Sequence, residues 1–90
     1  MTYKKFKDEV KKLGLDYYIL DTIIGIKNTK SIAICYIDTK KMFCAYQKAE
    51  FYSLDEKLQK KVFELIFNLA KTPINERGKL EWLIKNLKEK

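Results

Sequence analysis

The side chains of this sequence that could do chemistry are two cysteines, twelve carboxylates and many lysines, and its 90 residues include no histidine. Without histidine the chain has no Ser-His or Cys-His pair for nucleophilic catalysis and no imidazole to bind a metal. Cys35 and Cys44 lack the CxxC spacing of a zinc site, and the three scattered glycines form no phosphate-binding loop. We therefore expect a protein that is not an enzyme and holds neither a metal nor a cofactor.

The lysines are the other candidate site. They give the chain a net charge of +7, which suits nucleic acid, an anionic membrane or an acidic protein without choosing among them. A lysine excess that is spread along a chain is more often a solvated surface than a binding site. The candidates for a partner-binding basic face are Lys4, Lys7, Lys11, Lys57, Lys60 and Lys61.

Residues 53–71 form the longest amphipathic stretch, and we expect a helix there against which the rest of the chain packs. Phe63 and Phe67 widen its apolar face well beyond the arc of roughly 100° that a surface helix needs. The helix should therefore contact two other elements. Ser53 and Glu56 have the spacing of a capping box, in which each side chain bonds the backbone N–H of the other residue.

A shorter helix is predicted near the N-terminus, over residues 3–13. Thr2 is placed to cap its first turn, and Gly14 follows where a helix often ends in the left-handed conformation. Its apolar stripe is flanked by lysines on both sides, whose stems would cover the edge of the core.

Between these helices, β-branched and aromatic residues predict strands at residues 16–27, 31–38 and 41–47. The turns between them are short, which favours an antiparallel meander. The expected fold is α+β with the order α-β-β-β-α-α, a three-stranded antiparallel meander packed against helices in one domain.

A short turn at Thr39 and Lys40 would place Cys35 opposite Cys44 on one face of the sheet. In a cytoplasmic chain we expect two small buried thiols there rather than a disulfide. The same register makes both faces of the sheet apolar, unlike an antiparallel sheet with one wet face. We therefore expect helices on both faces, or a second chain on one of them.

Pro73 ends the long helix and can begin another one. Gly78 weakens this last helix and could divide it. Trp82 falls opposite its apolar stripe and is a candidate binding anchor, unless a bend at Gly78 lets the ring pack back. Glu76 and Arg77 are expected to form a surface ion pair.

The predicted element order is shared with double-stranded-RNA-binding domains, which use lysines at the start of their last helix, where Lys57, Lys60 and Lys61 fall. Two features argue against this analogy. Asp55 and Glu56 occupy the helix N-terminus, where a phosphate would need free N–H groups. The glycine-rich lead-in and the SKK-type opening of that family are also absent. Separately, the strands lack the aromatic motifs of ribonucleoprotein domains. Nucleic-acid binding is therefore the alternative hypothesis.

The long helix runs into the segment AKTPINER, residues 70–77. This part of the chain resembles a group of small phage and prophage proteins of Gram-positive bacteria. They combine a short helix, a β-meander and a leucine-rich helix ending in an A-x-TP-[IL]-x-ER turn. The match is closest over residues 51–78, and beyond it the tail differs from the acidic, lysine-rich tails of the group. The resemblance implies an accessory protein that works by binding, as inhibitors of host defence such as anti-CRISPR proteins do.

The leading expectation is therefore a protein partner, with a homodimer as a further possibility. The N-terminal residues have no secretory signal pattern, and no apolar run approaches the ~20 residues of a membrane span. We expect a cytoplasmic protein of the host cell that does not associate with membranes.

Overall fold

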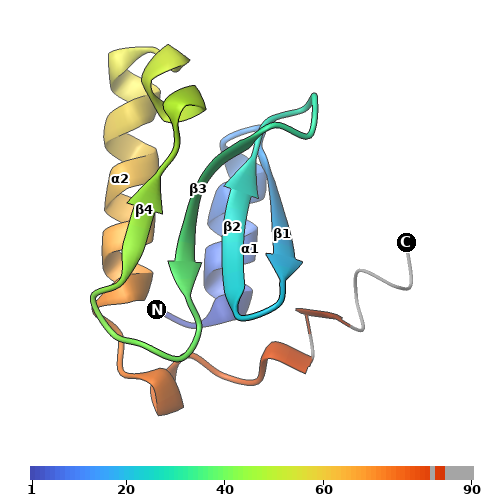
Figure 1. Cartoon of the computed structure of the whole chain (residues 1–90), viewed down its shortest axis with the longest axis vertical. Coiled ribbons are helices and arrows are strands. Elements are labelled where there is room, and N and C mark those ends of the chain that lie inside the picture. The colour runs from blue at the N-terminus through green and yellow to red at the C-terminus, as the bar shows by residue number, and fades with distance from the viewer. Residues whose placement is uncertain (82, 85–90) are drawn as a thin grey trace.

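The computed structural model describes residues 1–81, 83 and 84, so the predicted anchor Trp82 lies outside the described residues. One antiparallel sheet with the strand order β1-β2-β3-β4 packs against helices (Figure 1). The elements are α1 (Tyr3–Lys12), β1 (Asp16–Leu20), β2 (Ile23–Lys27), β3 (Ala33–Asp38), β4 (Ala45–Gln47), the 3-10 turn η1 (Ala49–Ser53), α2 (Glu56–Ala70) and the 3-10 turn η2 (Ile74–Glu76). The α+β class and the meander are confirmed, but the sheet has four strands and not three.

Helix α1 begins and ends as the sequence predicts. The Thr2 hydroxyl oxygen accepts a hydrogen bond from the Lys5 N–H at 3.1 Å, which caps the first turn. Gly14 follows the helix with a φ of +78°, a conformation that glycine adopts without steric cost. The buried side chains of α1 are Tyr3, Phe6 and Val10.

The stretch predicted as one strand over residues 16–27 is a hairpin. Strands β1 and β2 pair with Leu20 opposite Ile23, across a two-residue turn that begins with Asp21 at a φ of +55°. Aspartate tolerates this left-handed conformation better than most residues. Ile19 and Ile24 consequently share a face, whereas a continuous strand would have placed Ile19 and Ile23 together.

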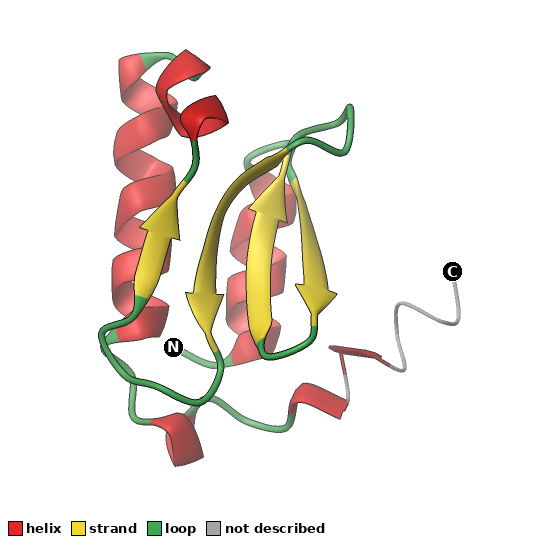
Figure 2. Ribbon diagram, viewed as in Figure 1, coloured by secondary structure: helices red, strands yellow, loops and turns green. Residues whose placement is uncertain are grey.

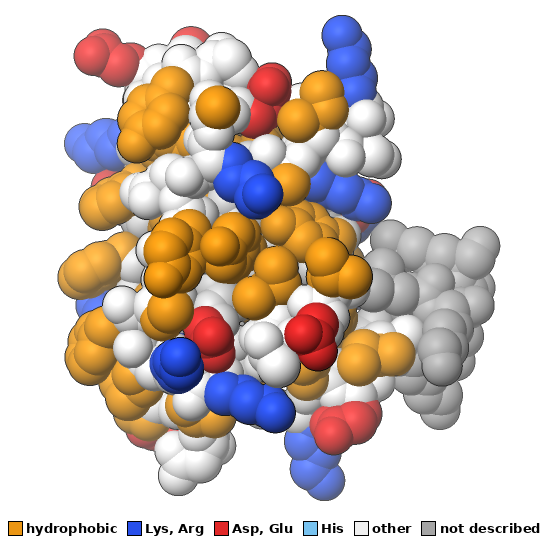
Figure 3. All heavy atoms as spheres, in the orientation of Figure 1, with side chains coloured by type: hydrophobic (Ala, Val, Ile, Leu, Met, Phe, Trp, Pro, Cys, Tyr) orange, Lys and Arg blue, Asp and Glu red, His pale blue; other side chains and the backbone are white. Residues whose placement is uncertain are grey.

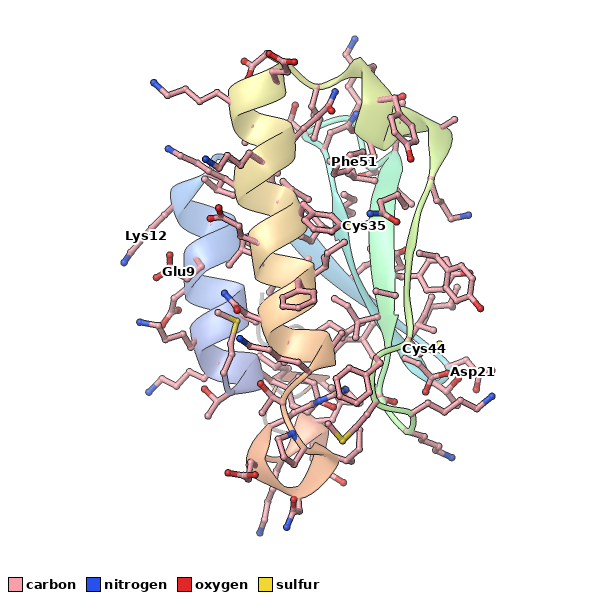
Figure 4. The ribbon with its side chains drawn as sticks, turned by 90° about the vertical axis from the view of Figure 1, so that its left-hand side faces the viewer. Glu9, Lys12, Asp21, Cys35, Cys44 and Phe51 are labelled. Atoms are coloured by element: carbon pink, nitrogen blue, oxygen red, sulfur yellow. The ribbon has the colours of Figure 1, made fainter. Side chains whose placement is uncertain are left out.

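The predicted pairing of Cys35 with Cys44 is also wrong. Cys35 lies opposite Gln47, because the loop between β3 and β4 is longer than the predicted turn. The Cys44 carbonyl instead accepts from the Asp38 N–H at 3.0 Å. Since side chains alternate along a strand, Cys35 points into the core and Cys44 to the opposite side of the sheet (Figure 4). Both cysteines are free thiols.

Helices α1 and α2 pack side by side on the same face of the sheet, behind it in the view of Figure 2. The core between them contains Phe6, Val10, Tyr17, Ile24, Ile26, Cys35, Ile37, Val62, Ile66 and Leu69, all almost completely buried. The prediction of helices on both faces is therefore wrong for the described part of the chain. We call the other side, which carries Tyr18, Leu20, Ile23, Tyr36 and Tyr46, the open face.

Helix α2 starts with a different cap from the one predicted. Its N-cap is Asp55, whose carboxylate accepts from the Leu58 N–H at 2.8 Å. Ser53 ends the preceding 3-10 turn, and its hydroxyl donates to the Glu50 carbonyl at 2.7 Å. The capping box fails because a 3-10 turn occupies the residues before the helix.

Arg77 is fully buried and is not the surface ion-pair member that we expected. Its Nε donates to the Thr72 carbonyl at 2.9 Å, Nη1 to the Asp38 carbonyl at 2.9 Å and Nη2 to the Ala70 carbonyl at 3.1 Å. The last carbonyls of a helix have no intrahelical donor, and the helix dipole favours a cation there. Arg77 thus caps α2 and ties its end to the end of β3.

The helix predicted to start at Pro73 is absent. Residues Ile74–Glu76 form only the short turn η2, and Gly78 has a φ of +96° that breaks any continuation. The helical residues described beyond it are Leu80, Glu81, Leu83 and Ile84. The prediction that Gly78 could divide the last helix is therefore confirmed.

Candidate functional site

Three exposed phenylalanines lie together where α2 meets β4. Phe43, Phe63 and Phe67 are 74%, 49% and 53% exposed, and all three line one shallow groove between the helix and the strand. Single exposed apolar residues are common, but a contiguous apolar patch usually has a function. Helix α1 offers no comparable patch, because its aromatic residues are buried.

The groove lies beside an edge of the sheet. The Lys48 N–H and the Cys44 carbonyl form hydrogen bonds with β3, and Tyr46 between them pairs with Tyr36. The backbone N–H and C=O groups of these alternate residues are therefore the ones directed toward β3. By the alternation of antiparallel hydrogen bonds, the N–H and C=O groups of Ala45 and Gln47 point away from β3. No described strand pairs with this outer side of β4. An edge of this kind is a template for another extended chain.

Helix α2 reaches beyond this edge. In Figure 1 it lies behind β4 and on the side of β4 away from β3, and Figure 4 shows it in front when the molecule is turned. Gln47 borders the groove together with Phe63, Phe67 and Lys71, and the volume of the groove is about 170 Å³. The Phe63 and Phe67 rings stack with their centroids 6.4 Å apart. The two rings thus form one continuous apolar surface on the exposed flank of α2.

Phe43 is held in an unusual backbone conformation. Its φ is +56°, in the left-handed region that costs a bulky residue roughly 1–2 kcal/mol. Its N–H donates to the Ala70 carbonyl at 2.9 Å, a bond that anchors the loop to the end of α2. Backbone strain of this kind concentrates at functional sites. Here the strained residue presents its ring to solvent at the groove.

The charges around the groove are of both signs. The Lys71 ammonium lies 5.4 Å from the centroid of the Phe67 ring, a cation–π distance. At the other end, Glu56 and Lys60 line a second shallow groove beside Gln47. The site therefore combines apolar contact area with a polar rim, as protein-binding surfaces do.

The predicted lysine cluster does not form one face. Lys4, Lys7 and Lys11 lie on α1, where the Lys11 ammonium contacts the Asp16 carboxylate at 2.7 Å. On α2, Lys60 lines the groove near β4, whereas Lys61 lines the groove between α1 and α2 among Lys5, Lys12, Glu9 and Glu64. Lys57 is exposed near the start of the same helix. The remaining candidate, Trp82, is outside the described residues.

Sequence reasoning placed Phe63 and Phe67 on the packed face of the long helix and Phe43 on an apolar face of the sheet, and it named none of the three as a binding residue. One feature of the sequence did indicate an exposed apolar site: the apolar arc of α2 is wider than a helix packed on a single sheet needs. The structure explains the surplus: Val62, Ile66 and Leu69 are buried against the core, while Phe63 and Phe67 remain on the exposed flank.

Comparisons of the chain with protein-family models, with curated proteins and with solved structures found no match. Among the residues that the structure describes, no three metal-ligating side chains come together. No helix within the described ranges is long and apolar enough to cross a membrane.

Proposed function

We propose that this protein acts by binding another protein, which adds an extended segment to the outer edge of β4. The observation that carries the proposal is the position of Phe63 and Phe67, which α2 exposes beyond the edge strand. An added strand would lie about 4.8 Å outside β4, with every second side chain directed toward α2. Its apolar side chains would cover the two rings, while its backbone bonded Ala45 and Gln47.

The proposed setting is the one that the sequence resemblance implies. We place the protein among phage and prophage accessory proteins, with a host protein as its partner, such as a component of host defence. Binding of this kind needs no catalytic group, and it uses the groove rather than the lysines of α1, Lys57 or Lys61. A polar rim with Lys71, Lys60 and Glu56 would select among partners by charge.

The test separates the backbone edge from the apolar groove. Gln47→Pro removes an N–H that points away from β3, so the sheet should keep its own hydrogen bonds. Phe63→Ser with Phe67→Ser removes the groove contacts, and Tyr52→Ser removes a more exposed aromatic ring on η1, outside the groove, as a control. Tagged wild type and variants are used to capture proteins from host cells, and their mass in solution is measured by light scattering.

We expect one protein to be retained by wild type and by Tyr52→Ser and to be lost, at least tenfold, with both groove variants. Retention that survives both groove variants would overturn the proposal. A wild-type dimer that Gln47→Pro converts to a monomer, with no other protein retained, would assign the edge to a second copy and would also overturn it.

A further inference from the structure

The open face carries a row of tyrosines that runs across the strands. Residue pairing aligns Tyr18 of β1 with Gly25, Gly25 with Tyr36 of β3, and Tyr36 with Tyr46 of β4. Three of the four positions in this cross-strand row are therefore aromatic and share one face. Tyr36 and Tyr46 stack with ring centroids 5.1 Å apart.

Because Gly25 has no side chain, the Tyr18 ring of this row can lie directly against the sheet. A Cβ at this position would overlap the Tyr18 ring, so the ring rests on the glycine backbone. Burial raises the pKa of the Tyr18 phenol, as expected for a ring held against the sheet. The Tyr18 ring thus forms a fixed part of the surface between β1 and β3.

Beside this row is a shallow depression of about 570 Å³, bounded by Leu20, Ile23 and Ala33 as well as two of the tyrosines. Its charged lining residues are Lys27 and Lys48, and no acidic side chain lines it. The Lys48 ammonium lies 5.8 Å from the centroid of the Tyr36 ring. Figure 3 shows this face, with apolar side chains across its middle and both basic and acidic side chains around them. The depression itself is aromatic at the base and positive at the rim.

We propose that the open face binds single-stranded nucleic acid. A base would stack on the rings of the tyrosine row, and adjacent phosphates would contact Lys27 and Lys48. Proteins that bind single strands combine these two features, aromatic rings for the exposed bases and cations for the backbone. The overall charge of +7 adds a long-range attraction for the same polyanion. A duplex, whose base faces are hidden, fits this surface less well.

An acidic protein could also be drawn to a positive face, but the tyrosine row favours bases. Strand β1 and strand β3 are two strands apart, so Tyr18 and Tyr36 are separated by roughly 10 Å along the sheet. The Tyr18 ring covers Gly25 between them, so a base would stack on the rings themselves and not on the strand backbone. The Asp38 carboxylate accepts from the Lys40 and Lys41 N–H groups at 2.7 and 3.0 Å and does not line the depression.

The experiment measures fluorescence anisotropy with labelled 15-nucleotide oligo(dT), oligo(U) and a duplex of the same length, at about 50 and 200 mM salt. Two or three phosphate contacts predict roughly a tenfold loss of single-strand affinity over this salt range. Tyr46→Leu and Tyr18→Leu should each weaken binding at least fivefold, because a base–ring stack is lost. Tyr52→Leu is the aromatic control.

Charge is tested with Lys27→Gln and Lys48→Gln together, against Lys57→Gln and Lys61→Gln, which remove equal charge from α2. We expect the first pair to weaken binding several-fold more than the second. Circular dichroism confirms that each variant is folded. The groove variants Gln47→Pro and Phe63→Ser should bind oligonucleotides as wild type does, which keeps this inference separable from the proposed protein partner.

Absence of single-strand binding at 50 mM salt would overturn the inference. Equal losses from the two lysine pairs would also overturn it, since they would show diffuse attraction to charge. Two further results would do the same: tighter binding of the duplex, or displacement of the oligonucleotide by polyglutamate at equal charge concentration. The last of these would assign the face to an acidic protein.

Discussion

Tyr18 packs its ring against Gly25 of the neighbouring strand, in the space that a side chain at position 25 would need. Gly25 in the interior of a strand would ordinarily be a weakness, because glycine has high backbone entropy and no side chain to pack. Here the aromatic ring of the cross-strand neighbour fills the gap. The pair keeps the centre of the open face low and apolar.

This relationship predicts a change of sign in a double-mutant cycle. Gly25→Ala in the wild-type protein should lower the free energy of unfolding by about 1–2 kcal/mol, because the Tyr18 ring must move away. In a Tyr18→Ala background the same substitution should be neutral or stabilising by about 0.5 kcal/mol, since only the entropy of the unfolded chain changes. Urea denaturation followed by circular dichroism measures both. Equal effects in the two backgrounds would contradict the packing described.

Arg77 should be among the most sensitive positions for stability. Arg77→Ala removes the side-chain donor of the Thr72 and Asp38 carbonyls and leaves the Ala70 carbonyl with the Phe43 N–H alone, and we expect a loss of about 3 kcal/mol. Arg77→Lys should recover only part of this loss, because an ammonium lacks the planar fork of donors. Thermal unfolding compares these variants with Glu76→Ala, an exposed control expected to be within about 0.5 kcal/mol of wild type.

Substitutions distinguish the two candidate N-caps of α2 by their contributions to stability. Asp55→Ala removes the acceptor for the Leu58 N–H and should cost about 1 kcal/mol. Ser53→Ala should cost less, because the Ser53 hydroxyl bonds Glu50 in the exposed turn before the helix. Chemical denaturation of the two variants decides the order. A larger loss of stability for Ser53→Ala would support the predicted capping box instead.

We expect Phe43 to lower the stability of the fold and to strengthen binding of the partner. Phe43→Gly relieves a positive φ at a side chain that is mostly exposed, and should raise the free energy of unfolding by about 1 kcal/mol. The same variant should bind the proposed partner of the groove more weakly. Phe43→Ala is the control, because it removes the ring and keeps the strain. A destabilised Phe43→Gly variant would mean that the ring contributes more packing than strain.

The cysteines should differ sharply in reactivity. Burial raises the pKa of the Cys35 thiol to about 12, so almost no thiolate is present near pH 8. Cys44 is only partly buried and lies on the other side of the sheet. Native protein should therefore incorporate one equivalent of iodoacetamide at Cys44, and Cys35 should react only in urea. Mass spectrometry after digestion assigns the site, and equal labelling rates would contradict the register of β3 and β4.

Much of the local structure followed from the sequence because it depends on neighbours in the chain. The Thr2 cap, the Gly14 stop and the extent of α1 rest on hydrogen bonds within one helix and on the conformational freedom of glycine. The helical periodicity of residues 56–70 and the α+β class rest on the same local rules. The residues 70–77 that carry the family resemblance also have a clear physical role, since they include the Arg77 cap.

The arrangement of the strands depended on tertiary structure. Residues 16–27 are mostly β-forming, and the irregularity that Asp21 indicates fits a bulge in one long strand as well as a hairpin turn. Only pairing with β3, which fixes Ile24 opposite Ile37, decides the face of each side chain. A shift of one residue moves every side chain of a strand to the other face. The tyrosine row and the separation of the two cysteines follow from that register.

The sequence by itself determined that this is a basic α+β chain without histidine, built on one strongly amphipathic helix. Tertiary structure decided which parts of its apolar surface are used for the core. Both helices cover one face of the sheet, and that leaves Tyr18, Tyr36 and Tyr46 on the other. Likewise, α2 reaches past β4 and keeps Phe63 and Phe67 exposed. The physical reason is that burial depends on what lies opposite a side chain, and hydrophobic periodicity describes only the side chain's own element.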